Sequence, residues 1–77
     1  MRLSETLGML STARQYVTDG EGYVSKQRAF VERLERQGLD TDDAIEYLET
    51  LEEMQAEYVE HMEKLEQEVL RLVRPRD

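Results

Sequence analysis

His61 is the single histidine of this 77-residue chain, and its carboxylate neighbours make it the first candidate for chemistry. Glu57 precedes His61 by four residues, the spacing at which two side chains of a helix are neighbours. Bundles that hold two metal ions use a Glu-x-x-His motif, but Tyr58 stands three residues before His61. Each chain therefore offers zinc or iron one nitrogen ligand and scattered carboxylates. We expect a surface His61 paired with Glu57, and a metal-binding helical bundle is the third functional hypothesis.

Hydroxyl nucleophiles are the next candidates for chemistry, because the chain contains several serines. Ser4, Ser11 and Ser25 fall in a stretch that favours a helix, with no histidine near them except across a dimer. The sequence has no nucleophile elbow, no glycine-rich phosphate loop and no triad spacing. The absence of Cys also excludes thiol catalysis and disulfides. We therefore expect a protein that is not an enzyme, with no catalytic residues and no cofactor.

Helices must carry these residues, since one Pro and four Gly leave two long helix-favouring stretches. Gly38 directly follows the first stretch and suits the left-handed conformation that ends a helix. Asp40 or Thr41 can cap the second helix, whose first turn carries Asp42 and Asp43. The pattern predicts an all-α, antiparallel two-helix hairpin: a helix over 4–37, a turn at 38–41, a helix over 42–73 and a charged tail at 74–77. These elements form one domain, 1–77.

Apolar residues recur with the four-three spacing of a coiled coil along both predicted helices. In the antiparallel hairpin, positions whose numbers sum to about 79 lie opposite each other. Gly20 should then face Tyr58 and provide room for its ring, and Ala13 should face Leu65. The seam residues of the first helix are Leu3, Thr6, Leu10, Ala13, Val17, Gly20, Val24, Gln27, Val31 and Leu34, and those of the second are Ala44, Leu48, Leu51, Gln55, Tyr58, Met62, Leu65, Val69 and Leu72.

Two glutamines and two glycines are the irregular residues of this pattern. Gln27 and Gln55 lie one turn apart across the seam, where we expect them to hydrogen-bond each other or water and to fix the register. Gly20 and Gly22 weaken the first helix by about 1 kcal/mol each relative to Ala. The apolar spacing stays in phase across both glycines, which favours a continuous or gently bent helix over a break.

Large apolar side chains extend beyond this seam, and an isolated hairpin would leave them in water as a patch. Exposed patches of this kind usually mark an interface. We therefore expect the hairpin to dimerise into a four-helix bundle, as a homodimer or a higher homo-oligomer. A third helix from a different protein is the alternative. The residues assigned to self-association are Met9, Tyr16, Tyr23, Phe30, Tyr47, Met54 and Tyr58.

The negative charge is concentrated in the second half of the chain. Residues 1–39 carry a net charge of +1 and residues 40–77 carry −9, and no basic residue lies between Asp40 and Glu63. Such a run is typical of the solvated side of a long helix. Its functional alternative is docking on a basic protein partner, which would be sensitive to salt. The residues assigned to this partner-facing surface are Glu46, Glu49, Glu53, Glu57 and Glu60.

The net charge of −8 and the hydropathy pattern predict where the chain acts. No basic stripe is present, so we expect no direct binding to nucleic acid. No stretch approaches about 18 consecutive apolar residues, and the polar side of the first helix is near neutral, so we expect no membrane contact. The start MRLSETLGMLSTARQ lacks a secretory apolar core, which predicts a cytoplasmic protein.

The stretch from Tyr16 to Leu70 resembles a group of short, uncharacterised alphaproteobacterial proteins. Their pattern contains V-x-x-G-E-x-x-V-x-x-Q, then V-x-x-L-E-x-x-G-x-D-T-x-x-A-x-x-h-L and a second helix. The residues that match it are Gly20, Glu21, Val24, Gln27, Val31, Leu34, Glu35, Gly38, Asp40, Thr41, Ala44 and Leu48. This chain departs from the pattern in its greater acidity and in residues 1–15. The resemblance implies a helical hairpin and no known activity.

The sequence thus predicts a non-enzymatic interaction or scaffold module built on a self-associating helical hairpin. The runner-up hypothesis is a small acidic inhibitor or decoy that docks on a basic protein surface, including one that handles nucleic acid. The metal-binding bundle ranks third.

Overall fold

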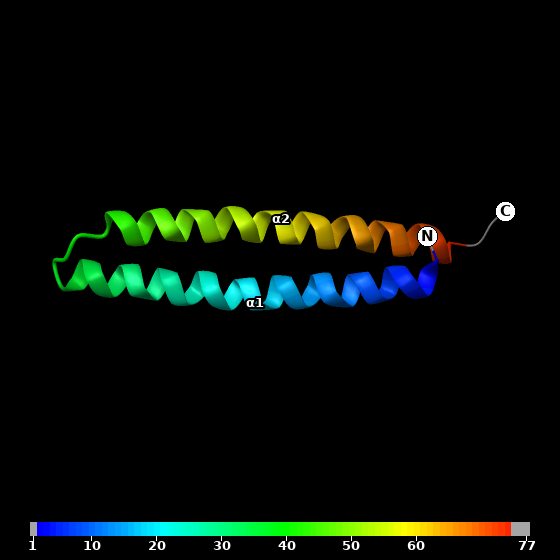
Figure 1. The fold of residues 1–77 in the computed structure, drawn as a ribbon, viewed down its shortest axis with the longest axis horizontal. Helices are drawn as coiled ribbons and strands as arrows, with labels where there is room; N and C mark the ends of the chain where they lie inside the picture. Colours follow the sequence, from blue (N-terminus) through cyan, green and yellow to red (C-terminus); the bar gives the residue numbers. More distant parts are fainter. Residues whose placement is uncertain (1, 75–77) are drawn as a thin grey trace.

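The computed structural model describes residues 2–74 and consists of two long antiparallel helices lying side by side (Figure 1). Helix α1 spans Leu3–Arg36 and helix α2 spans Asp42–Val73. Each observed boundary lies within one residue of its predicted position. The predicted charged tail begins at Arg74, and its remaining residues, 75–77, lie outside the described part of the chain. The molecule is a rod of 63 × 15 × 15 Å. The predicted all-α hairpin is confirmed.

The turn between the helices has the geometry that its glycine predicts. Gly38 has a φ of +69°, the left-handed region, and follows the last turn of α1. The amide of Leu39 donates to the carbonyl of Leu34 at 3.0 Å, and the amide of Gly38 donates to the carbonyl of Glu35 at 3.1 Å. These two bonds are the Schellman motif that satisfies the final carbonyls of a helix. Across the turn, the carboxylate of Asp40 accepts a 3.0 Å bond from the amide of Asp42.

Gly38→Ala is therefore expected to destabilise the hairpin by about 1–2 kcal/mol, because a Cβ disfavours the left-handed conformation. Chemical denaturation followed by circular dichroism measures this loss. Gly8→Ala is the matched control, since Gly8 lies in α1 with open space where its Cβ would stand. That control should gain up to about 1 kcal/mol from helix propensity. Equal effects at the two glycines would contradict the assigned role of Gly38.

The buried residues lie along the predicted seam and form a narrow core. Leu10, Ala13 and Leu65 make one cluster, and Met62 and Val69 pack against it. The predicted contact between Ala13 and Leu65 is thus confirmed. The remaining buried seam positions are Thr6, Val17, Gly20, Val31 and Ala44. Leu3, at the first turn of α1, is exposed instead, because α2 provides too little cover at this end of the rod.

Helix α1 is continuous through Gly20 and Gly22, as the phase of the apolar residues predicts. The prediction that Gly20 makes room for the ring of Tyr58 was wrong. A Cβ added to Gly20 would stand 1.8 Å from Oε1 of Gln55, so the space beside this glycine holds the Gln55 amide. The ring of Tyr58 instead stacks on Tyr16, with 5.7 Å between the ring centroids. The two tyrosines attract each other across the groove and leave the position beside Gly20 to the more flexible glutamine.

Gly22→Ala should stabilise the hairpin by up to about 1 kcal/mol, because the added Cβ meets open space in an exposed helix. Gly20→Ala should lose most of that gain. Its Cβ would displace the Gln55 side chain. This would break the hydrogen bond that the Gln55 amide donates to the carbonyl of Val17, which has a net value of about 1 kcal/mol. Thermal unfolding of the two variants side by side tests this difference, and an equal rise in Tm for both would show that Gln55 does not need the space.

Candidate interaction surface

The groove between α1 and α2 has two sides, and two ion pairs bridge one of them. Arg14 pairs with Glu66 at 3.2 Å, and Arg28 pairs with Glu52 at 3.3 Å. All four side chains remain well exposed, so each pair contributes at most about 1 kcal/mol. The sequence reading missed these pairs. The heptad pattern could have predicted them. The residues that pair occupy equivalent positions on opposite helices, where charges of opposite sign meet: Arg14 and Arg28 on α1, Glu52 and Glu66 on α2.

The other side of the groove is lined by large apolar residues, and we call it the aromatic face. Its members on α1 are spaced by seven residues, and those on α2 lie opposite them. Tyr23 is 61% exposed and Tyr47 is 55% exposed, although both are large aromatic residues. The aromatic face consists of Met9, Tyr16, Tyr23, Phe30, Tyr47, Met54 and Tyr58, the residues predicted to mediate self-association. The structure thus places all seven on one side of the rod.

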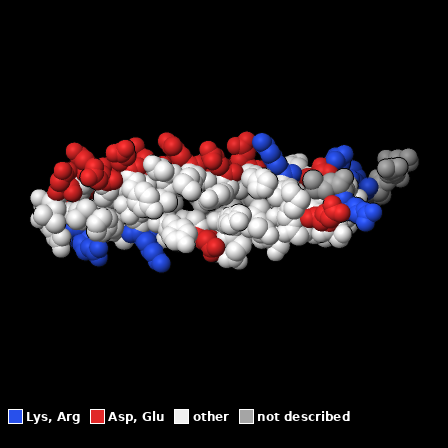
Figure 2. Space-filling model, viewed as in Figure 1, with Lys and Arg blue, Asp and Glu red and all other residues white. Residues whose placement is uncertain are grey.

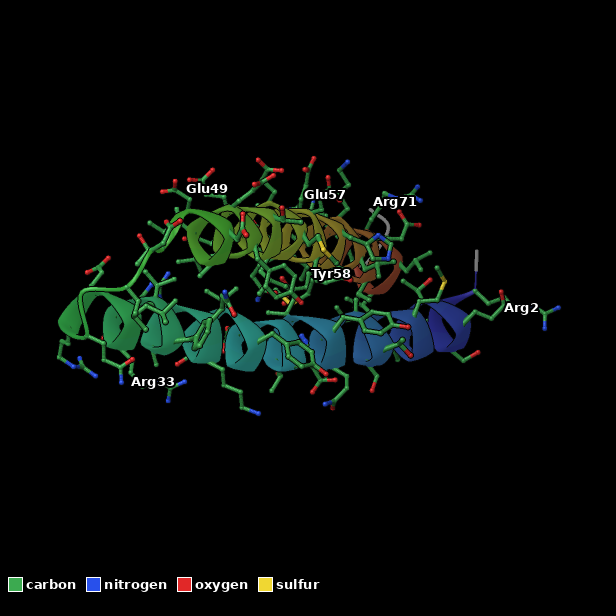
Figure 3. The ribbon with its side chains drawn as sticks, turned by 60° about the vertical axis from the view of Figure 1, so that its left-hand side comes forward. Arg2, Arg33, Glu49, Glu57, Tyr58 and Arg71 are labelled. Atoms are coloured by element: carbon green, nitrogen blue, oxygen red, sulfur yellow. The ribbon has the colours of Figure 1, made fainter. Side chains whose placement is uncertain are left out.

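A shallow hollow of about 400 Å³ lies at the centre of the aromatic face. Tyr16, Tyr23 and Tyr58 form part of its wall. Tyr47, Leu51 and Met54 of α2 also line it. Tyr58 points into the space between the helices (Figure 3), where its stacking on Tyr16 holds both rings in place. Toward the turn, the guanidinium of Arg33 covers the ring of Phe30 at 5.3 Å. The face is therefore apolar, grooved and locally ordered.

Gln27 and Gln55 lie half-buried between the helices. Of the two predicted partners, each other or water, the first is wrong, because both amides donate to backbone carbonyls. The amide of Gln27 donates to the carbonyl of Ala44 at 2.9 Å, and the amide of Gln55 donates to the carbonyl of Val17 at 2.8 Å. Each glutamine thus ties its own helix to the backbone of the other. Oε1 of Gln55 is buried without a hydrogen-bond partner. The small residues Gly20 and Ala44 let the two amides approach the opposite backbone. The amides therefore bond to backbone carbonyls and not to each other.

His61 borders the aromatic face rather than pairing with Glu57. It lines a second hollow together with Met9, Thr12 and Tyr16. None of the ion pairs of the described residues joins Glu57 to His61, so the predicted pair is not formed. His61 shares the heptad row of Tyr47 and Met54, which places it beside the aromatic face. Within residues 2–74, no three His, Asp or Glu side chains converge as metal ligands would.

The outer side of α2 carries the predicted acidic surface, which consists of Glu46, Glu49, Glu53, Glu57 and Glu60. All five are exposed, and Figure 2 shows a row of acidic side chains along the α2 edge. Glu60 pairs with Lys64 at 3.2 Å, and no ion pair of the described residues involves the other four. Farther along α2, the hydrogen bond and charge of Glu68 raise the pKa of Arg71. Of the five acidic-surface residues, Glu60 alone thus has an ion-pair partner among the described residues.

Neither helix, over the residues described, has an apolar segment long enough to cross a membrane.

Comparison of the chain with protein-family models, curated proteins and solved structures gave no match.

Proposed function

We propose that the chain is a non-enzymatic interaction module that self-associates through its aromatic face into a dimeric four-helix bundle. The asymmetry of the hairpin carries this proposal. Two ion pairs bridge one side of the groove, whereas the other side leaves three tyrosines, a phenylalanine and two methionines between 39% and 61% exposed. A contiguous patch of this kind on a soluble rod marks an interface. A second copy offers the same aromatic face, and a two-fold axis brings both together.

The exposed area of the hairpin supports the need for a partner. The chain exposes 6164 Å², whereas a compact monomer of the same 9.1 kDa exposes about 4,900 Å². Its radius of gyration of 17.7 Å also exceeds the roughly 11–12 Å of a compact domain of 77 residues. The excess of about 1,300 Å² is larger than the roughly 800 Å² that one partner contributes to a standard interface and lies in the range of obligate homodimers. Burying it between two hairpins gives each helix two neighbours in place of one.

Thermal unfolding at a series of protein concentrations tests this proposal. When folding and association are coupled, Tm rises with concentration, because mass action favours the dimer over the unfolded chain. We expect an increase of several degrees between about 1 and 100 μM. A Tm that stays constant over this range would contradict the proposal, since an independently stable hairpin unfolds at the same temperature at any dilution.

The acidic surface supports a second candidate function, that of an inhibitor or decoy that docks on a basic protein. Glu49 and Glu57 point away from α1 (Figure 3), and Glu46, Glu53 and Glu60 lie farther from the aromatic face than Glu57, so most of this strip can meet a partner when the aromatic face is covered. Association through such a strip depends on screened charges. Capture of partners from a lysate at 50 mM and 500 mM salt distinguishes the two functions. A decoy loses its partner at high salt, whereas self-association through apolar contacts persists.

A further inference from the structure

Two rows of charged residues border the aromatic face, and they repeat the same order of charges. The residues of each row are spaced by seven. Each residue of the α2 row lies 38 positions after its counterpart in the α1 row. Both rows run acidic, threonine, acidic, basic, basic from the start to the end of their helix. The α1 row is Glu5, Thr12, Asp19, Lys26 and Arg33, and the α2 row is Asp43, Thr50, Glu57, Lys64 and Arg71. All ten residues are exposed.

The antiparallel arrangement of the helices turns this repeat into a diagonal pattern of charge. Near the turn, the basic end of the α1 row lies across the aromatic face from the acidic end of the α2 row. At the far end Glu5 of α1 lies across from Arg71 of α2, which also pairs with Glu68 of its own helix. Figure 2 shows this arrangement: the middle of the face carries almost no charge, the α1 edge is basic toward the turn, and the α2 edge is acidic there. The aromatic face thus has like charges at diagonal corners and opposite charges at adjacent corners.

A second copy of the chain fits this pattern when two aromatic faces meet about a two-fold axis. If the axis runs along the rod, α1 of one copy lies against α2 of the other. Arg33 then approaches Asp43 of the second copy, and Glu5 approaches its Arg71. If the axis instead crosses the rod, α1 lies against α1 and Arg33 approaches Glu5 of the second copy. The charges at the rim are complementary in both dimers, which supports a face-to-face pair of copies.

The acidic surface distinguishes these two dimers. Glu46, Glu53 and Glu60 lie one row outside the α2 rim, whereas the equivalent α1 positions are Gly8, Gln15 and Gly22. An axis across the rod would place the two α2 helices side by side, with these glutamates as neighbours. An axis along the rod places the α2 helices at diagonal corners of the bundle, and each then has α1 on both sides. The second arrangement separates the like charges by the larger distance.

We propose that two copies pack through their aromatic faces about an axis parallel to the rod, so that both turns lie at the same end of the bundle. This inference rests on the proposed self-association and specifies its geometry. It assigns the charge rows a role in orientation, while the aromatic contacts provide the affinity. Complementary charges at the rim of an interface fix register and exclude wrong partners more than they add affinity.

Spin labels test the geometry, because the chain contains no Cys and a single substitution gives a single label. Gln37→Cys places the label at the turn, where the residue is exposed. Dipolar spectroscopy of labelled protein should give a distance below about 35 Å between the copies if the turns share one end. The opposite orientation would separate the labels by about the length of α1, roughly 50 Å at 1.5 Å per residue.

Thr18→Cys is the matched control, since this exposed residue lies near the middle of α1. Its labels are close together in either dimer and report association alone. A short distance at both sites supports the proposal. A long distance at the turn with a short one at Thr18 overturns the shared end but leaves self-association intact. The absence of dipolar coupling at both sites at 100 μM overturns both proposals.

Discussion

Tyr23→Glu is expected to convert the dimer into monomers at micromolar concentration. Tyr23 is 61% exposed in the single hairpin and borders the central hollow of the aromatic face, so association would bury it. The substitution places one carboxylate of each copy in an apolar interface, which costs several kcal/mol when no partner compensates it. A loss of about 3 kcal/mol raises the dissociation constant more than 100-fold. Light scattering at about 10 μM measures the change in mass.

Ser25→Glu is the matched control for this substitution. Ser25 is exposed on the same helix, but it lies away from the aromatic face. The control adds the same charge to the same chain, so it should leave the mass unchanged. If Tyr23→Glu kept the wild-type mass, or if both variants dissociated equally, the aromatic face would not be the contact between copies.

Leu10→Ala is expected to destabilise the fold by about 2–5 kcal/mol, the second large effect. Leu10 is 3% exposed and packs with Ala13 and Leu65 in the clustered part of the core. Truncation leaves a cavity in a seam only one residue wide, and the total stability of a small domain is about 5–15 kcal/mol. Urea denaturation followed by circular dichroism measures the loss.

The control for the core substitution lies one turn away. Leu7 is 47% exposed, so Leu7→Ala removes the same atoms from a partly solvated position. We expect it to cost less than about 1 kcal/mol, in line with other surface substitutions. A similar loss at both leucines would refute the observed register, in which Leu10 is buried and Leu7 is exposed.

The hairpin was predictable because strong local signals and the apolar spacing agree. Gly38 ends α1 in the predicted left-handed conformation, and the four-three spacing identified the buried seam, including the contact between Ala13 and Leu65. The same spacing placed the seven residues of the aromatic face on one side of the rod. Such features depend only on helix geometry, which a sequence specifies residue by residue.

The partners of individual polar side chains could not be predicted in the same way. The register gives each position along the rod to within about one turn, but a side-chain rotamer decides which atom it reaches. Gln27 and Gln55 therefore found backbone carbonyls instead of each other. Gly20 accommodates Gln55 rather than Tyr58 for the same reason. His61 was expected to pair with Glu57, yet it borders the aromatic face with Tyr16.

Sedimentation equilibrium of the unmodified chain between about 1 and 100 μM tests self-association most directly, because it measures mass without labels or substitutions. Self-association through the aromatic face predicts a species of twice the 9.1 kDa chain mass, present in moderate salt and retained at high salt. A single-chain mass at every concentration, with the helical signal intact, would contradict it.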